Sequence, residues 1–166
     1  GTDAVMLSGE SALGNYPIES VKTMNDIIVN VEKDKNNFNL ENKDETLSKK
    51  IDNTDAITNA AYSIAVNAGA KAIITFSVSG KTSMRMARER SPVQVISLSP
   101  NIKTSRKMQM YWGINSCHTE DANSAKEMVE IACSVVKEKK IAQHDDNVVI
   151  TAGIPFGNAG STNLLR

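Results

Sequence analysis

The sequence has no excess of either charge, because its 166 residues carry 19 basic and 19 acidic side chains. A dedicated nucleic-acid binder needs a basic excess to neutralise phosphates, so this balance argues against that class. No run of about 18 apolar residues occurs, so no segment is predicted to span a membrane. Two cysteines are too few for a disulfide framework and fit a reducing, cytoplasmic environment.

The sequence also lacks a basic start followed by an apolar stretch, so no signal peptide is predicted. It begins at Gly1 rather than at a methionine, which indicates that the natural amino terminus lies elsewhere. Aromatic residues make up only 4%, but 40% of the residues are hydrophobic. The length therefore fits one domain with a sizeable core, or one domain plus part of another.

Apolar runs and apolar helical faces alternate along the chain after position 52. Apolar residues at spacings of three or four predict helices over 53–68, 81–89, 101–111 and 125–139. Continuous apolar runs predict strands over 71–76, 93–98, 113–118 and 147–152, with a short fifth strand at 163–165. Such alternation requires crossover connections, so the predicted fold class is three-layer α/β/α with a mostly parallel sheet of about five strands.

Two further elements are predicted before this region. Residues 4–7 form a continuous apolar run, which is typical of a strand buried on both faces. A loop over 8–16 follows, and Pro17 then begins a predicted helix. The polar stretch 34–51 is predicted to be a linker. The expected domains are therefore 1–33, the linker 34–51, and 52–166.

The loop 77–83 joins a predicted strand to a predicted helix and is the strongest candidate site. Its hydroxyls, one flexible glycine and one ammonium lie at a helix amino terminus, where unpaired N–H groups favour phosphate. The candidate phosphate-binding residues are Ser77, Ser79, Gly80, Lys81 and Thr82.

The same loop is compatible with one other interpretation, and a second is excluded. Serine and threonine are common helix N-caps, so the loop is also compatible with a cap and a turn alone. A nucleotide-triphosphate P-loop is excluded, because the pattern needs glycine five positions before Gly80 and Thr75 stands there instead.

A second glycine-rich loop follows the predicted strand 147–152, at the same edge of the sheet. Gly157, Asn158 and Gly160 are the candidates for a loop that closes over a ligand, because glycines allow close backbone approach. A flexible hairpin without function is the alternative.

Other residues are weaker candidates. The cysteines and histidines lack metal-ligand spacing, so no metal site is predicted from Cys117, His118, Cys133 and His144. The arginines are expected to form a solvated helix face, and the tryptophan is expected to pack; these residues are Arg85, Arg88, Arg90 and Trp112.

Several motifs together resemble the pyruvate kinase family over the whole chain. The carriers are Gly1-Thr2-Asp3-Ala4-Val5-Met6-Leu7-Ser8-Gly9-Glu10-Ser11-Ala12, Gly14-Asn15-Tyr16-Pro17-Ile18-Glu19-Ser20-Val21, Ser79-Gly80-Lys81-Thr82-Ser83 and Gly160-Ser161-Thr162-Asn163. The first two look like the strand and helix that close the family's (β/α)₈ barrel. The last two look like loops of its C-terminal domain. The resemblance thus implies a strand–helix remnant of the barrel before the α/β domain.

The resemblance implies a parent enzyme that transfers phosphate from phosphoenolpyruvate to ADP in glycolysis. It also implies magnesium and potassium in the parent, and mostly tetrameric assembly. The family's catalytic lysine and its metal ligands have no counterpart here, so the fragment is expected to be inactive and without a cofactor. Ser8 alone matches a position near the family's active site, and its expected role in this chain is a strand-end turn.

The resemblance further implies that the C-terminal domain is regulatory and that its hydroxyl-rich loop holds an effector's phosphate. Val78 stands where many relatives have a polar residue, and no Trp and Arg pair for a second phosphate follows His118. The effector is therefore expected to be a sugar phosphate or a nucleotide monophosphate. Two alternatives remain: a purely structural assembly domain with a vestigial pocket, and a free-standing phosphate-sensing module.

Overall fold

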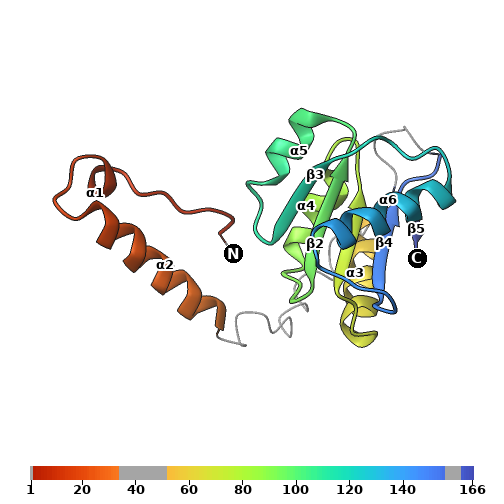
Figure 1. Cartoon of the computed structure of the whole chain (residues 1–166), viewed down its shortest axis with the longest axis horizontal. Helices are drawn as coiled ribbons and strands as arrows, with labels where there is room; N and C mark the ends of the chain where they lie inside the picture. The colour runs from red at the N-terminus through yellow and green to blue at the C-terminus, as the bar shows by residue number, and fades with distance from the viewer. Residues whose placement is uncertain (1, 34–51, 156–161) are drawn as a thin grey trace. The chain divides into compact units, whose positions relative to one another are not determined.

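The structure is a computed structural model that describes residues 2–33, 52–155 and 162–166. The chain divides into two compact units, Gly1–Lys49 and Lys50–Arg166 (Figure 1). In the described ranges, no helix is both long enough and apolar enough to cross a bilayer.

The first unit contains a short helix α1, Gly9–Ala12, and a longer helix α2, Pro17–Lys33. The start of α2 at Pro17 confirms the predicted helix, because a proline costs no hydrogen bond in the first turn. The predicted strand over 4–7 is wrong, since residues 4–8 carry no regular structure. A lone strand has no partner for its backbone N–H and C=O groups, so an apolar run alone does not form one. Helix α1 lies within the segment expected to be a loop.

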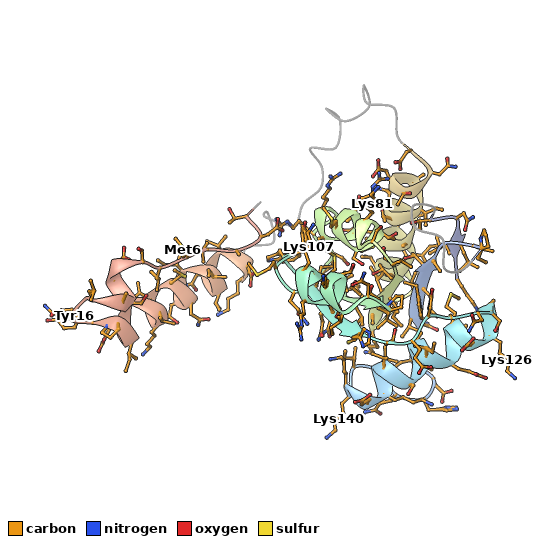
Figure 2. The ribbon with its side chains drawn as sticks, turned by 90° about the horizontal axis from the view of Figure 1, so that it is seen from above. Met6, Tyr16, Lys81, Lys107, Lys126 and Lys140 are labelled. Carbon is orange, nitrogen blue, oxygen red and sulfur yellow. The ribbon has the colours of Figure 1, made fainter. Side chains whose placement is uncertain are left out.

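The side chains of the first unit are largely solvent-exposed (Figure 2). Met6 is 86% exposed, and Ile18 and Val21 on α2 are 77% and 55% exposed. No residue of α1 or α2 is buried. The apolar face of α2 therefore has no covering layer within the described part of this unit.

The second unit is built on a five-stranded sheet with the order β3-β2-β1-β4-β5. The strands are β1 Ala72–Phe76, β2 Gln94–Ser99, β3 Ile114–His118, β4 Val148–Ala152 and β5 Leu164–Leu165. The first four are parallel, and β5 is antiparallel to β4 at the edge. This confirms the predicted α/β class and its mostly parallel sheet.

Four helices flank this sheet, and three of them begin at a side-chain cap. They are α3 Asn53–Asn67, α4 Lys81–Arg88, α5 Ile102–Met108 and α6 Ala125–Glu138. Asp52, Asn101 and Ser124 accept hydrogen bonds from first-turn N–H groups of α3, α5 and α6. Each predicted helix is present, and each ends one to three residues earlier than its apolar periodicity indicated.

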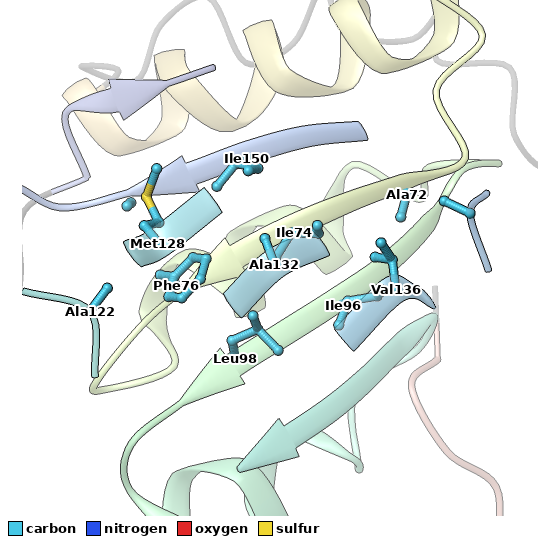
Figure 3. Close-up of a cluster of buried hydrophobic side chains, with 12 residues drawn as sticks. Ala72, Ile74, Phe76, Ile96, Leu98, Ala122, Met128, Ala132, Val136 and Ile150 are labelled. Carbon is cyan, nitrogen blue, oxygen red and sulfur yellow. The ribbon is translucent and has the colours of Figure 1, made fainter. Parts of the chain in front are cut away.

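Helix α6 covers one face of the sheet (Figures 1 and 3). Its buried side chains Met128, Ala132 and Val136 pack against alternate residues of β1, β2 and β4. Ile74, at the centre of this cluster, is fully buried, and burying such a side chain contributes about 1.5–3 kcal/mol. The sheet residues of this cluster are Ala72, Ile74, Phe76, Ile96, Leu98, Ile150 and Ala152.

Helices α3, α4 and α5 form the layer on the opposite face. Small residues of α3, among them Ala61 and Ala65, are fully buried in a second apolar cluster. Met86 of α4 and Met108 of α5 join the same cluster. The small alanine side chains let α3 approach the sheet closely. This side of α3 is therefore buried in the core of its own unit.

Candidate functional site

The loop between β1 and α4 lies at the carboxyl ends of the parallel strands, where α/β sheets bind ligands. The Ser77 hydroxyl accepts a hydrogen bond of 3.0 Å from the Gly80 N–H, which closes the loop on itself. Gly80 has φ +80°, in the left-handed region that favours glycine. A Cβ there would lie 2.8 Å from Met108 Sδ, so a side chain would be strained by the backbone and would displace the end of Met108.

Helix α4 begins at this glycine without any side-chain cap. Its first turn contains no acidic residue, and Lys81 stands at its first position. The N–H groups of a first helical turn have no acceptor within the helix, and the helix dipole adds partial positive charge there. Among the four helices of this unit in the described residues, α4 alone presents such an uncapped end. It is suited to binding an anion.

A chain of buried hydroxyls fixes the first turn of α4 to the sheet. Ser83 Oγ lies 2.7 Å from Thr75 Oγ1 on β1 and 2.7 Å from Ser97 Oγ on β2. All three side chains are fully buried. Thr75 donates to the Ile96 carbonyl, which can only accept. Because each hydroxyl has one proton, Ser83 then donates to Thr75 and Ser97 donates to Ser83.

This chain belongs to a row of hydroxyl residues across four strands. The register places Thr75 opposite Ser97 on one side and opposite Thr151 on the other. Ser116 on β3 continues the row opposite Ser97 and donates to Ser105 of α5 at 3.2 Å. The row anchors both α4 and α5 on the sheet just below the candidate loop.

A second hydroxyl contact ties α4 to the end of the chain. Thr82 Oγ1 lies 2.6 Å from Thr162 Oγ1, and both residues are buried. The next residue, Asn163, donates to the Ile154 carbonyl at 2.6 Å and accepts from the Ile154 N–H at 2.7 Å. These contacts bring both ends of the second candidate loop together beside the first turn of α4.

The predicted site residues therefore have different environments. Ser77 is half-buried, Ser79 and Lys81 are exposed, and Gly80 and Thr82 are buried. Lys81 lies at the surface where α4 begins (Figure 2). The hydroxyl of Thr82 is already engaged by Thr162, a contact that the sequence analysis did not foresee.

Other predicted residues lie elsewhere. Ser8 is in the first unit, where its N–H donates to Glu10 Oε2 at 3.0 Å and it precedes helix α1. It is exposed and is not at a strand end, contrary to expectation. Gly157, Asn158 and Gly160, the expected closing loop, lie outside the described residues, as does the predicted linker 34–51.

The expectation of a solvated arginine face is wrong for two of the three arginines. Arg85 is paired with Asp52 and lies 3.3 Å from Asp55, both at the start of α3. The Arg85 hydrogen bond and the Asp55 N–H lower the pKa of the Asp52 carboxyl to about 2. Arg90 stacks over Trp112 at 4.8 Å from the ring centroid. Both guanidinium groups therefore have partners within the protein.

In the ranges that the structure describes, no three His, Cys, Asp or Glu side chains gather to hold a metal ion. The two cysteines are free and partly buried. His118 Nε2 contacts the Pro100 carbonyl at 3.1 Å, and His144 lies 2.9 Å from Asp145. Each histidine is engaged locally rather than in a shared site.

Comparison with known proteins decides the family. The family model of the pyruvate kinase alpha/beta domain matches residues 55–166, which include all five strands and the α4 loop. The chain belongs to the pyruvate kinase family. This match confirms the resemblance drawn from the sequence motifs.

Individual pyruvate kinases match the whole chain. The pyruvate kinase of Geobacillus stearothermophilus is 39% identical over 170 residues, covering 100% of this chain and 28% of that protein. The pyruvate kinase of Methylorubrum extorquens is 37% identical over 166 residues, covering 100% of this chain and 34% of that protein. The chain thus spans about a third of these relatives' length.

A solved structure supports the fold. The crystal structure of a pyruvate kinase from Cryptosporidium parvum superposes with a TM-score of 0.84 at 23% identity. It covers 100% of this chain, which corresponds to 32% of that protein. At this identity the likeness concerns the fold alone.

Proposed function

We propose that the unit 50–166 is the regulatory domain of a pyruvate kinase and that it binds a phosphorylated effector at the start of α4. The binding residues would be Ser77, Ser79, Gly80, Lys81 and Thr82. The ligand is a sugar phosphate or a nucleotide monophosphate, held by its phosphate group.

The observation that carries this proposal is the uncapped amino terminus of α4. Gly80 offers no side chain to its first-turn N–H groups, whereas Asp52, Asn101 and Ser124 cap the other three helices of the unit in the described residues. An anion satisfies such N–H groups, and the exposed ammonium of Lys81 adds a point charge.

A thermal-shift and calorimetric titration of the 166-residue chain tests the proposal. The probes are fructose 1,6-bisphosphate, glucose 6-phosphate, ribose 5-phosphate, AMP and inorganic phosphate. A ligand at 100 times its Kd adds about 2.7 kcal/mol of stability, which raises the unfolding midpoint measurably. We expect at least one phosphorylated probe to bind selectively.

The matched pair of variants is Lys81→Ala and Lys126→Ala. Lys126 is also an exposed lysine in the first turn of its helix, but Ser124 caps that helix (Figure 2). We expect Lys81→Ala to weaken binding about tenfold or more, because a hydrogen bond to a charged group is worth about 1.5–3 kcal/mol. Lys126→Ala should leave it unchanged. If the two variants weaken binding equally, the ligand is attracted by general surface charge and not by a site at α4.

The alternative is a structural assembly domain with a vestigial pocket. Its supporting observation is α3, where Ile64 and Val66 are 46% and 42% exposed although the helix is alanine-rich on its buried side. If no probe shifts the midpoint while light scattering shows a homo-oligomer, the structural function is the better one. We propose a homo-oligomer in both cases.

For the complete protein we propose phosphoryl transfer from phosphoenolpyruvate to ADP in the cytoplasm. The family resemblance places the magnesium and potassium ligands outside this chain, so we assign both ions to the remainder of the enzyme; in the described residues no three His, Cys, Asp or Glu side chains gather. The chain alone should give no pyruvate in a coupled assay. Turnover above background would contradict this assignment.

The rest of the enzyme is the proposed partner of the first unit. Ile18, Val21 and Val31 on α2 are 77%, 55% and 54% exposed, and apolar surface on a helix favours burial against another element. The family resemblance implies a barrel domain as that partner. Ile18→Asp should therefore lower the stability of the complete enzyme more than it lowers the stability of this chain alone.

A further inference from the structure

Thr82 and Thr162 form a hydroxyl pair that joins the candidate phosphate site to the last residues of the chain. Their oxygens lie 2.6 Å apart although the residues are 80 positions apart in sequence. Thr82 is 6% exposed and Thr162 is 4% exposed, so both side chains are largely buried. In the described residues, neither hydroxyl has a second hydrogen-bond partner.

The number of protons in this pair is decisive. Each threonine hydroxyl carries one proton, and the contact between the two oxygens uses only one of the two. One O–H donor therefore remains available at the base of the α4 loop. A buried donor without an acceptor is costly, so a ligand that only accepts hydrogen bonds is favoured there.

The position of Thr82 determines which proton is available. Thr82 is the second residue of α4 and follows Gly80 and Lys81, so it shares the first turn with the uncapped N–H groups. Thr162 lies on the other side of the pair, next to Asn163, whose side chain is fully occupied by the backbone of Ile154. An anion held by these N–H groups would lie beside Thr82, whereas the contact of Thr162 with the first turn of α4 is through Thr82.

We infer that Thr162 is a positioning residue of the phosphate site: it donates to Thr82 and thereby directs the single Thr82 proton to a phosphate oxygen. The inference rests on the proposed function, because it requires an anion at α4. A hydrogen bond received from Thr162 polarises the Thr82 hydroxyl and strengthens the charge-assisted bond that it donates. It also holds the Thr82 side chain in one rotamer.

The test titrates the 166-residue chain with inorganic phosphate and with sulfate, which at neutral pH only accepts hydrogen bonds. Thr82→Val should weaken binding about tenfold or more, because a direct bond to a charged group is lost. Thr162→Val should weaken it about three- to tenfold, since only the orientation and polarisation of Thr82 are lost. Thr162→Ser keeps the hydroxyl and should bind within about twofold of the unchanged chain.

The double variant Thr82→Val with Thr162→Val distinguishes a relay from a second direct contact. If Thr162 acts only through Thr82, the double variant binds as weakly as Thr82→Val alone. If the two losses multiply, Thr162 touches the anion independently and the inference is overturned.

A matched control separates positioning from stability. Thr58 is another fully buried threonine of this unit, and its hydroxyl bonds only to backbone carbonyls of α3, at 3.0 Å. Thr58→Val should lower the unfolding midpoint and leave the phosphate Kd unchanged. If Thr162→Val behaves in the same way, with a lower midpoint and an unchanged Kd, its role is structural and the inference is wrong.

Failure of the proposed function gives a different result. In that case the unchanged chain binds neither phosphate, sulfate nor any phosphorylated probe, and both proposals fall together. Circular dichroism of each variant confirms that it is folded, and the comparison of Thr162→Val with Thr162→Ser remains decisive even if Thr82→Val does not fold.

Discussion

Removal of the Ser83 hydroxyl is the sharpest test of how α4 is held on the sheet. Ser83→Ala loses two buried bonds of 2.7 Å, one from Ser97 and one to Thr75. Thr75 keeps its own acceptor at Ile96, but the Ser97 proton loses its acceptor in a fully buried position. An unsatisfied buried donor costs about 1–3 kcal/mol, so we expect a loss of about 2–3 kcal/mol in the free energy of unfolding.

The assay is urea and thermal unfolding followed by circular dichroism and by the fluorescence of Trp112, the single tryptophan. A loss of this size lowers the midpoint of a domain of this length by roughly 8–12 °C. The control is Ser63→Ala, which removes a hydroxyl bonded at 3.1 Å to the Asn59 carbonyl on α3. That variant should change stability by less than about 0.5 kcal/mol, since alanine is the better helix former.

A combined variant tests whether the unpaired buried donor is the cause of the lost stability. Thr75→Val, Ser83→Ala and Ser97→Ala together replace the whole chain of hydroxyls by apolar groups. Because no donor of the chain is left unpaired, the triple variant should recover at least half of the stability lost by Ser83→Ala alone. A Ser83→Ala variant within about 0.5 kcal/mol of the unchanged chain would refute the argument.

Two further predictions concern the ends of α4 and α3. Gly80→Ala should destabilise the unit by about 1–3 kcal/mol in urea unfolding, because alanine is strained at φ +80° and its Cβ would collide with Met108; a neutral result would contradict the tight loop. The Asp52 pKa is lowered to about 2 from 3.8, so its contribution to stability is present above pH 4 and is lost as the pH falls toward 2. Asp52→Asn should flatten that part of the pH dependence of the unfolding midpoint, and an unchanged profile would show that the ion pair contributes nothing.

Much of the fold could be predicted because local pattern and tertiary environment agree in the second unit. The apolar run at 71–76 is buried on both faces, as expected of a central parallel strand, and became β1. The same kind of run at 4–7 does not form a strand, because no strand of the described residues pairs with it. The difference lies in the partners, which a run of residues does not specify.

The candidate site was predictable only in part. The glycine, the lysine and the hydroxyls of the loop follow from a strand–turn–helix pattern, and their place at the sheet edge follows from parallel topology. The engagement of Thr82 by Thr162 has no local signal, because the two residues are 80 positions apart. Arg85 was likewise expected to lie on a solvated helix face. The packing of α3 beside α4 instead pairs it with Asp52.

The sequence by itself predicted the helices and the mostly parallel strands of the second unit, and its motifs resemble the family that the comparison confirms. It also indicated the loop between β1 and α4 as the candidate anion site, which stays a prediction. The periodicity of apolar residues, the residues at helix ends and short motifs are local properties. Each can be recognised from a few neighbouring positions in the sequence. The tertiary structure alone decided which hydroxyls are joined, as in the two bonds that link Thr75 and Ser97 through Ser83. These bonds exist because parallel pairing places Thr75 opposite Ser97, and folding brings Ser83 of α4 within hydrogen-bond distance of both.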